Sequence, residues 1–280
     1  MESGGSTVGR MGIRIRPKTL AGAEADGEKF MHAQGAKTLS ELRAMPWQKL
    51  TNPEPGLRFS PIVDGYFLPA PVLTVFAEAK QNDVVSLTGI NAGELQGLTG
   101  PERSPATVEA YQQEAKKRFG DRAEEFLKLY PVATEREVRS AMQESARDGN
   151  VTALYLWARV RAKTSKTPVY EYLWNHALPG PDAPRYGAFH SSELPYVLNT
   201  LNMSDRPFTP QDHQIAGIMS TYWANFVTHG NPNGTGVAHW PPVGKEPEVM
   251  EVGDDFKQVP VAASQAKFEF WKSVLLTGSE

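Results

Sequence analysis

The stretch that organises the chain is residues 169–196, VYEYLWNHALPGPDAPRYGAFHSSELPY. Its first six residues are mostly β-branched or aromatic and lie between Pro168 and a Pro-Gly pair at 179–180, so residues 169–174 are predicted to form one strand of a buried sheet. The loop after this strand carries His190, and an imidazole held at the end of a rigid strand can accept and return a proton near neutral pH. His190 is therefore a candidate for proton transfer, although an arbitrary one of the chain's six histidines is more often solvated or structural.

An acidic residue follows an earlier predicted strand in the same way. Residues 84–89, VVSLTG, have the composition of a strand and lead into the polar turn 90–94, which ends with Glu94. The ends of neighbouring parallel strands lie side by side, so Glu94 and His190 are predicted to meet in the folded chain. An acid that precedes a histidine also agrees with the order Ser, acid, His of the α/β-hydrolases. The alternative for Glu94 is an ordinary surface carboxylate.

The same two segments resemble motifs of a known family. Residues 89–94, GINAGE, resemble the G-x-N-x-x-E turn that carries the acid of the type-B carboxylesterases, the family of the cholinesterases and para-nitrobenzyl esterases. Residues 187–196, GAFHSSELPY, resemble the segment that carries its catalytic histidine. Other matches follow in the same order, at residues 2–5, 63–65, 68–69, 222–226 and 230–234. The resemblance implies a serine hydrolase of carboxylic esters in which Glu94 and His190 are the catalytic acid and histidine.

The family's nucleophile segment has no match in this sequence. Its G-E-S-A-G elbow and its oxyanion glycines lie upstream of the segment that residues 2–5 resemble, and no G-x-S-x-G occurs here. Residues 1–5 imitate an elbow around Ser3, but an elbow follows a strand directly and the family match places Ser3 after it, so Ser3 is not favoured as the nucleophile. We therefore expect residues 1–280 to be the C-terminal portion of one α/β-hydrolase domain, with an incomplete mixed sheet flanked by helices. The missing N-terminal half is a candidate partner, and the activity of this chain alone is not assured.

The composition excludes several classes of function. The 29 basic and 32 acidic side chains give a formal net charge of −3, which does not favour a nucleic-acid partner. Without cysteine, the chain has no disulfide, catalytic thiolate or zinc-thiolate site. No apolar run is long enough to predict a membrane span. We expect no cofactor and no metal ion, and the sequence does not indicate where in the cell or outside it the protein works.

Helical patterns account for much of the remaining chain. Helices are predicted at 17–34, 39–45, 71–80, 210–229 and 262–275, a strand at 248–252, a loop at 47–59, and a small hairpin or extended arm around Asp64 and Gly65. Residues 104–163 are predicted to be a helical insertion, interrupted at Asp148-Gly149-Asn150, that forms a cap beside the site by analogy with the family. Leu154 and its neighbours at 155, 157 and 158 either line a substrate pocket or, as we favour, pack in the core.

Two functions remain open at this stage. The first is a carboxylic ester hydrolase, of which this chain holds the acid and the histidine. The second is a non-catalytic interaction module, because cholinesterase-like domains without a triad serve in adhesion. Glu94 and His190 favour the first, since a binding module has no need to keep both. The sequence does not indicate the acyl group or the alcohol of the substrate.

Overall fold

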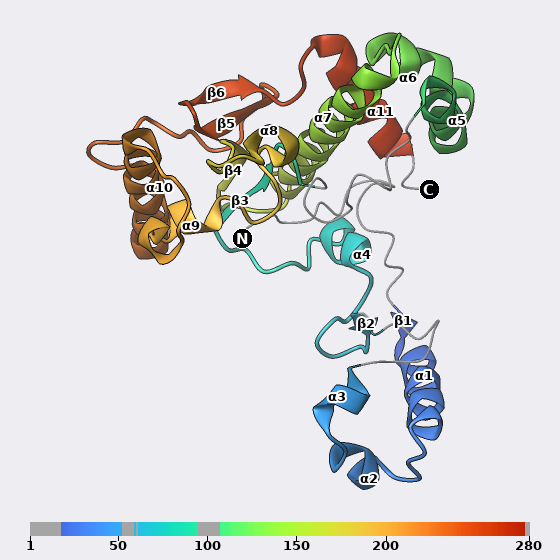
Figure 1. Ribbon diagram of the computed structural model, residues 1–280. Helices are drawn as coiled ribbons and strands as arrows, with labels where there is room; N and C mark the ends of the chain where they lie inside the picture. The colour runs from blue at the N-terminus through green and yellow to red at the C-terminus, as the bar shows by residue number, and fades with distance from the viewer. Residues whose placement is uncertain (1–17, 52–58, 60, 95–106, 278–280) are drawn as a thin grey trace. The chain divides into compact units, whose positions relative to one another are not determined.

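The computed structural model describes residues 18–51, 59, 61–94 and 107–277. The chain divides into two compact units, one that spans Ile13–Gln81 and one that includes Asn82–Glu280. Figure 1 labels the helices and strands of both.

The smaller unit is mainly helical. Its helices are α1 (Leu20–Ala33), α2 (Leu39–Arg43), α3 (Trp47–Leu50) and α4 (Val72–Ala77). The predicted start of α2 is confirmed, because the Thr38 side chain accepts a hydrogen bond from the Glu41 amide at 3.2 Å. The prediction of loop from residue 47 was wrong for α3, where a single helical turn forms directly after Pro46.

The turn at Asp64 and Gly65 does not join the strands of a hairpin. The carboxylate of Asp64 accepts hydrogen bonds from the amides of Tyr66 and Leu68, both at 3.0 Å, and Gly65 has a φ of 77°. The strand before this turn, β2 (Ile62–Val63), instead pairs in parallel with β1 (Lys18–Thr19). The turn residues were identified correctly, but the strand partner comes from a distant part of the chain, which local turn chemistry cannot reveal.

A four-stranded sheet forms the centre of the larger unit. Its strands are β3 (Ser86–Asn91), β4 (Val169–Asn175), β5 (Glu248–Gly253) and β6 (Phe256–Pro260), in the order β3-β4-β5-β6. The first three are parallel and β6 is antiparallel, so the predicted mixed sheet is confirmed. Sequence reasoning missed β6, whose residues are mostly half-buried or exposed and lack a strong apolar pattern.

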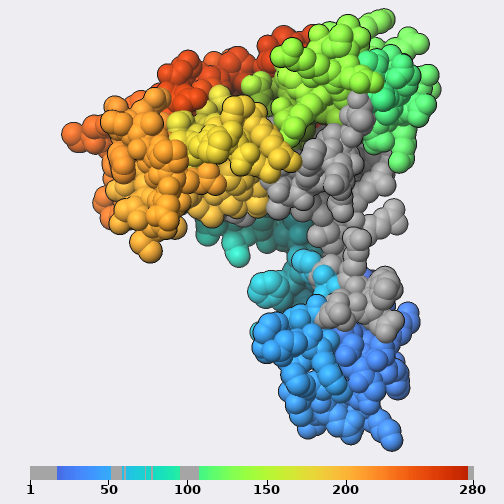
Figure 2. Space-filling view, in the orientation of Figure 1, coloured from blue at the N-terminus to red at the C-terminus, as the bar shows by residue number. Residues whose placement is uncertain are grey.

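Helices cover both faces of this sheet (Figure 1). On β4, Leu173 packs on one face, in a cluster with side chains of several helices, while Tyr172 and Trp174 pack on the other. The helices and short 3-10 turns of this unit are α5 (Val108–Phe119), η2 (Gly120–Arg122), α6 (Ala123–Leu129), α7 (Glu135–Arg161), α8 (Ala183–Tyr186), α9 (Leu194–Val197), η3 (Leu201–Met203), α10 (Pro210–His229) and α11 (Gln265–Thr277). The first cluster joins α5, α6, α7 and α11, and the second joins α9 and α10. Figure 2 shows α10 in orange and α5 and α6 in green on the surface.

The predicted interruption of the helical region at residues 148–150 was wrong. α7 runs without a break for 27 residues. Asp148 is fully buried inside it and accepts hydrogen bonds from the Tyr130 hydroxyl at 2.9 Å and from the Arg147 guanidinium at 2.8 Å. The contact with Tyr130 comes from outside α7 and offsets the weak helix propensity of an Asp-Gly-Asn sequence, which local sequence reasoning could not detect.

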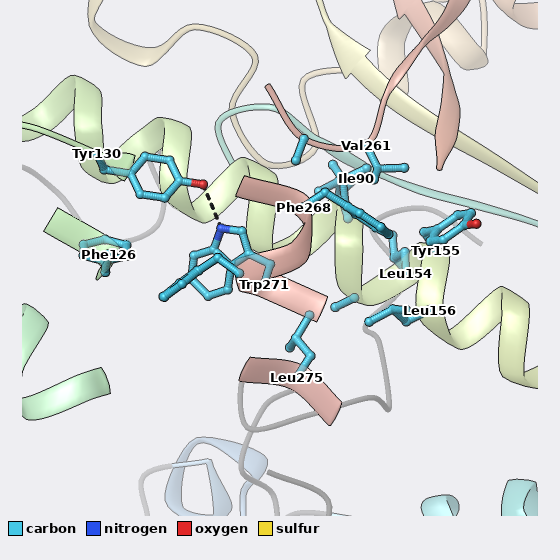
Figure 3. Close-up of a cluster of buried hydrophobic side chains, with 14 of the residues drawn as sticks. Ile90, Phe126, Tyr130, Leu154, Tyr155, Leu156, Val261, Phe268, Trp271 and Leu275 are labelled. Atoms are coloured by element: carbon cyan, nitrogen blue, oxygen red, sulfur yellow. Dashed lines mark hydrogen bonds between the residues drawn. The ribbon is translucent and has the colours of Figure 1, made fainter. Parts of the chain in front are cut away.

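Leu154 and its neighbours, considered above as a possible pocket lining, belong to the core. Leu154 and Tyr155 are 2% and 4% exposed and lie with Ile90, Phe268 and Leu275 in the cluster drawn in Figure 3. In the same view the Trp271 indole N–H donates to the Tyr130 hydroxyl at 2.8 Å. Core packing, the favoured interpretation, is therefore confirmed. No helix in the described ranges is both long and apolar enough to cross a membrane.

Candidate functional site

The candidate site lies where β3 and β4 end. The two strands are parallel neighbours, and their last paired residues include Asn91 opposite Trp174. Backbone pairing continues beyond the strands, because the Ala92 amide donates to the Trp174 carbonyl at 2.9 Å and the Gly93 amide donates to the Ala188 carbonyl at 2.8 Å. The turn after β3 is thereby joined to the distant loop that carries His190.

Glu94 and His190 meet across this junction. A carboxylate oxygen of Glu94, Oε2, lies 2.6 Å from His190 Nδ1, so the predicted contact between the two side chains is confirmed. Since the carboxylate can only accept, Nδ1 carries the proton of this hydrogen bond and Nε2 remains as the basic nitrogen. The side chains are 14% and 37% exposed, so the pair is partly sheltered but accessible to a reactant. The other carboxylate oxygen, Oε1, accepts from the Asn91 amide at 2.9 Å.

Neighbouring polar groups hold the histidine loop. The side-chain amide of Asn91 donates to the Phe189 carbonyl at 2.7 Å and to the carboxylate of Glu193. The Ser192 hydroxyl accepts from the Trp174 indole at 2.9 Å. Sequence reasoning gave Asn91 no role, although it stands in the quoted G-x-N-x-x-E pattern. The Asn in that motif was the one signal in the sequence that could have pointed to these contacts.

Ser3 and the motif at residues 2–5 lie outside the described residues. Among the described residues, no group of three or more histidine, aspartate and glutamate side chains could hold a metal ion. The chemistry that the described groups can perform is proton transfer at His190 Nε2, supported by a carboxylate at Nδ1.

A second polar cluster lies around His176, in the loop after β4. His176 contacts Asp212 through Nε2 at 2.9 Å and Asp254 through Nδ1 at 2.6 Å, and the Tyr196 hydroxyl donates to Asp212 at 2.6 Å. Asp212 also closes the capping box of α10 with Thr209. Burial raises the pKa of the Asp212 carboxyl, but hydrogen bonds from Thr209, Tyr196 and His176 lower it by more, and the pKa falls to about 2. This cluster joins β4 to the start of α10, and we interpret it as structural.

The comparisons with known proteins agree with the fold. The model of the carboxylesterase family matches residues 16–271. Relatives include fumonisin B1 esterase of Sphingopyxis macrogoltabida, 28% identical over 83% of this chain and 43% of the relative, and cocaine esterase of Homo sapiens, 28% identical over 90% of this chain and 47% of the relative. Bile salt-activated lipase of Homo sapiens is 26% identical over 66% of this chain and 27% of its own length. The chain thus spans less than half the length of these relatives.

Proposed function

Because the chain belongs to the carboxylesterase family, we propose that it is the acid- and histidine-bearing portion of a serine-type hydrolase of carboxylic esters. The observation that carries this proposal is the 2.6 Å contact between Glu94 and His190, at the ends of adjacent parallel strands of an α/β-hydrolase sheet. The proposal includes a single hydrolase domain that continues beyond this portion, with residues 104–163 as a helical cap. The names of these relatives refer to different substrates, and the substrate proposed for this chain is a carboxylic ester as a class.

In the proposed reaction His190 moves one proton in each half of the cycle. Nε2 accepts the proton of a serine hydroxyl while the serine oxygen bonds to the ester carbonyl carbon, and the same proton then passes to the departing alcohol. Water attacks the acyl-enzyme in the same way, with His190 as base and then as acid. Glu94 holds the Nδ1 proton and stabilises the imidazolium that forms in each step.

The serine and the oxyanion donors are proposed to come from an upstream segment of the whole esterase. No G-x-S-x-G occurs in residues 1–280, and the relatives extend beyond the matched region. A histidine and an acid can move a proton, but they offer no covalent nucleophile and no backbone donors for a tetrahedral intermediate. Loss of one oxyanion donor alone slows such enzymes about 10²- to 10³-fold.

The test compares this chain alone with this chain co-expressed with an upstream half that carries the elbow. The chain alone is expected to show background hydrolysis of a short-chain nitrophenyl ester and no labelling by a fluorophosphonate probe. Co-expression is expected to produce both signals, and His190→Ala is expected to remove the turnover. Labelling of the chain alone that disappears in Ser3→Ala would instead make Ser3 the nucleophile.

The competing function is a non-catalytic cholinesterase-like interaction module. That function predicts a stable complex of the two halves with neither turnover nor labelling, and no effect of His190→Ala on any property of the complex. The proximity of Glu94 and His190 argues against it, because an interaction surface does not require an acid and a histidine joined at a strand end.

A further inference from the structure

We propose that Asn91 is a positioning residue that fixes Glu94 and His190 relative to each other, an inference that rests on the proposed esterase function. Asn91 is the last residue of β3 and is 1% exposed. It contacts the acid through its backbone and the histidine loop through its side chain. One residue on a rigid strand therefore holds both members of the pair.

The backbone of Asn91 orients the acid. Its amide N–H donates to Glu94 Oε1 at 2.9 Å, and Oε2 then points to His190 Nδ1 at 2.6 Å. A carboxylate that is fixed through one oxygen offers its second oxygen in a defined direction. The acid thus enters the contact with His190 already oriented.

The side chain of Asn91 anchors the peptide that leads into His190. Nδ2 donates to the Phe189 carbonyl at 2.7 Å and to the Glu193 carboxylate, with a longer contact of 3.5 Å to the Ser192 hydroxyl. Both main acceptors require an N–H donor, so the orientation of the amide follows from its partners. An aspartate of the same shape would place oxygen against oxygen at both contacts.

The histidine loop needs such an anchor because its own backbone is unusual. Ser191, directly after His190, has a φ of 70°, a left-handed conformation that few non-glycine residues adopt and that neighbouring structure must hold. The His190 side chain is 37% exposed, so packing alone does not fix its ring. A displacement of about 1 Å in a catalytic group can lower a rate about 10²-fold.

A different role for Asn91 must be separated from this one, namely that it only provides a partner for the buried Glu193. Three variants make the distinction. Asn91→Ala removes all three contacts of the side-chain amide. Glu193→Gln removes the charge and leaves the donor to the Phe189 carbonyl in place. The double variant Asn91→Asp, Glu193→Gln exchanges donor and acceptor between positions 91 and 193, and leaves the Phe189 carbonyl without its donor.

The primary measurement is the ring N–H proton of His190, observed by NMR in chain labelled with ¹⁵N-histidine and assigned by its loss in His190→Gln. We expect this low-field signal to persist in Glu193→Gln. In Asn91→Ala and in the double variant it is expected to move upfield or to vanish by exchange with water. Asn225→Ala is the matched control, because Asn225 Nδ2 also donates to a carbonyl, that of Pro232 at 3.1 Å, but away from the pair. Its His190 signal should not change.

Three outcomes would overturn the inference. The first is a native His190 signal in Asn91→Ala with an unchanged melting temperature. The second is a native His190 signal in the double variant, which would leave Asn91 only as the partner of Glu193. The third is loss of the His190 signal in Glu193→Gln, and this outcome can be measured even if Asn91→Ala does not fold. In the co-expressed esterase we expect kcat to fall about 10²-fold in Asn91→Ala with little change in KM. The predicted NMR pattern without any turnover in the wild-type complex would refute the esterase proposal and leave the positioning role intact.

Discussion

At the scale of single residues, Glu171 is a buried carboxyl group in an environment that disfavours its charged form. It lies in the middle of β4, is 2% exposed, and neither of its oxygens has a hydrogen-bond partner among the described residues. Burial raises the pKa of the Glu171 carboxyl well above its usual value. A protonated, neutral carboxyl is therefore the form that the fold tolerates, and the folded chain holds a proton that the unfolded chain releases near pH 4.5.

We predict that Glu171→Leu raises the free energy of unfolding at pH 7 by about 1–3 kcal/mol, because a buried polar group without a partner is replaced by an apolar one. Because the pKa of Glu171 is raised in the folded state, Glu171 contributes most to the free energy of unfolding of the wild type below pH 4.5. This contribution declines as the pH rises toward the folded-state pKa. The increase in the free energy of unfolding caused by Glu171→Leu should therefore be larger at pH 7 than at pH 4. Urea unfolding at both pH values measures it, with exposed Glu248→Leu as the control. Destabilisation by Glu171→Leu at both pH values would contradict this account.

Asp212 has the opposite titration behaviour. Its pKa is lowered to about 2, so its contribution to stability is present above pH 3.8 and is lost as the pH falls toward 2. We predict that Asp212→Asn lowers the free energy of unfolding by about 2 kcal/mol at pH 7, and by much less near pH 2. Asp254→Asn is the control, because Asp254 contacts the same histidine but is 57% exposed and should cost less than about 1 kcal/mol. Equal losses in both variants across this pH range would refute the distinction.

At the scale of elements, patterns that depend on near neighbours predicted the structure best. The strand at residues 169–174 and the start of α10 at Thr209 and Pro210 follow from composition and capping, and both are confirmed. β6 was missed although β5 ends at Gly253 and β6 begins at Phe256, because β6 lacks a strong apolar pattern. The parallel partner of β2 was missed because β1 is distant in the sequence. The contact of Glu94 with His190 was predicted because each residue follows a predicted strand. The hydrogen bond from Asn91 to the Phe189 carbonyl spans 98 residues, and only the Asn of the G-x-N-x-x-E motif pointed to it.

α7 continues through Asp148, where local propensity predicts a break. We predict that Asp148→Ala lowers the free energy of unfolding by about 3 kcal/mol, because the Tyr130 hydroxyl and the Arg147 guanidinium lose a buried acceptor. Glu144→Ala is the control on the same helix, since its carboxylate is 42% exposed and pairs with Lys267. That change should cost less than about 1 kcal/mol. Thermal unfolding followed by circular dichroism at 222 nm distinguishes the two, and similar losses would show that Asp148 has no special role.

At the scale of the whole molecule, β3 is an edge strand of the sheet in the described part of the chain. β3 pairs there with β4 alone, yet its residues Leu87, Ile90 and Asn91 are buried, as in strands that lie inside a parallel sheet. The relatives extend well beyond the matched region. We therefore expect the proposed upstream half to be a structural partner as well as the source of the nucleophile.

This expectation separates assembly from catalysis. We predict that an upstream half whose elbow serine is replaced by alanine still binds this chain and raises its melting temperature by several degrees, because a partner at about 100 times its Kd adds about 2.7 kcal/mol to the stability of the folded state. His190→Ala should show the same rise, since its side chain is proposed to act on the substrate and not on the interface. Differential scanning calorimetry and co-elution on size exclusion measure both effects. A wild-type complex that turns over ester without any rise in melting temperature would show that the two halves meet only transiently, and that the open side of β3 is not where they join.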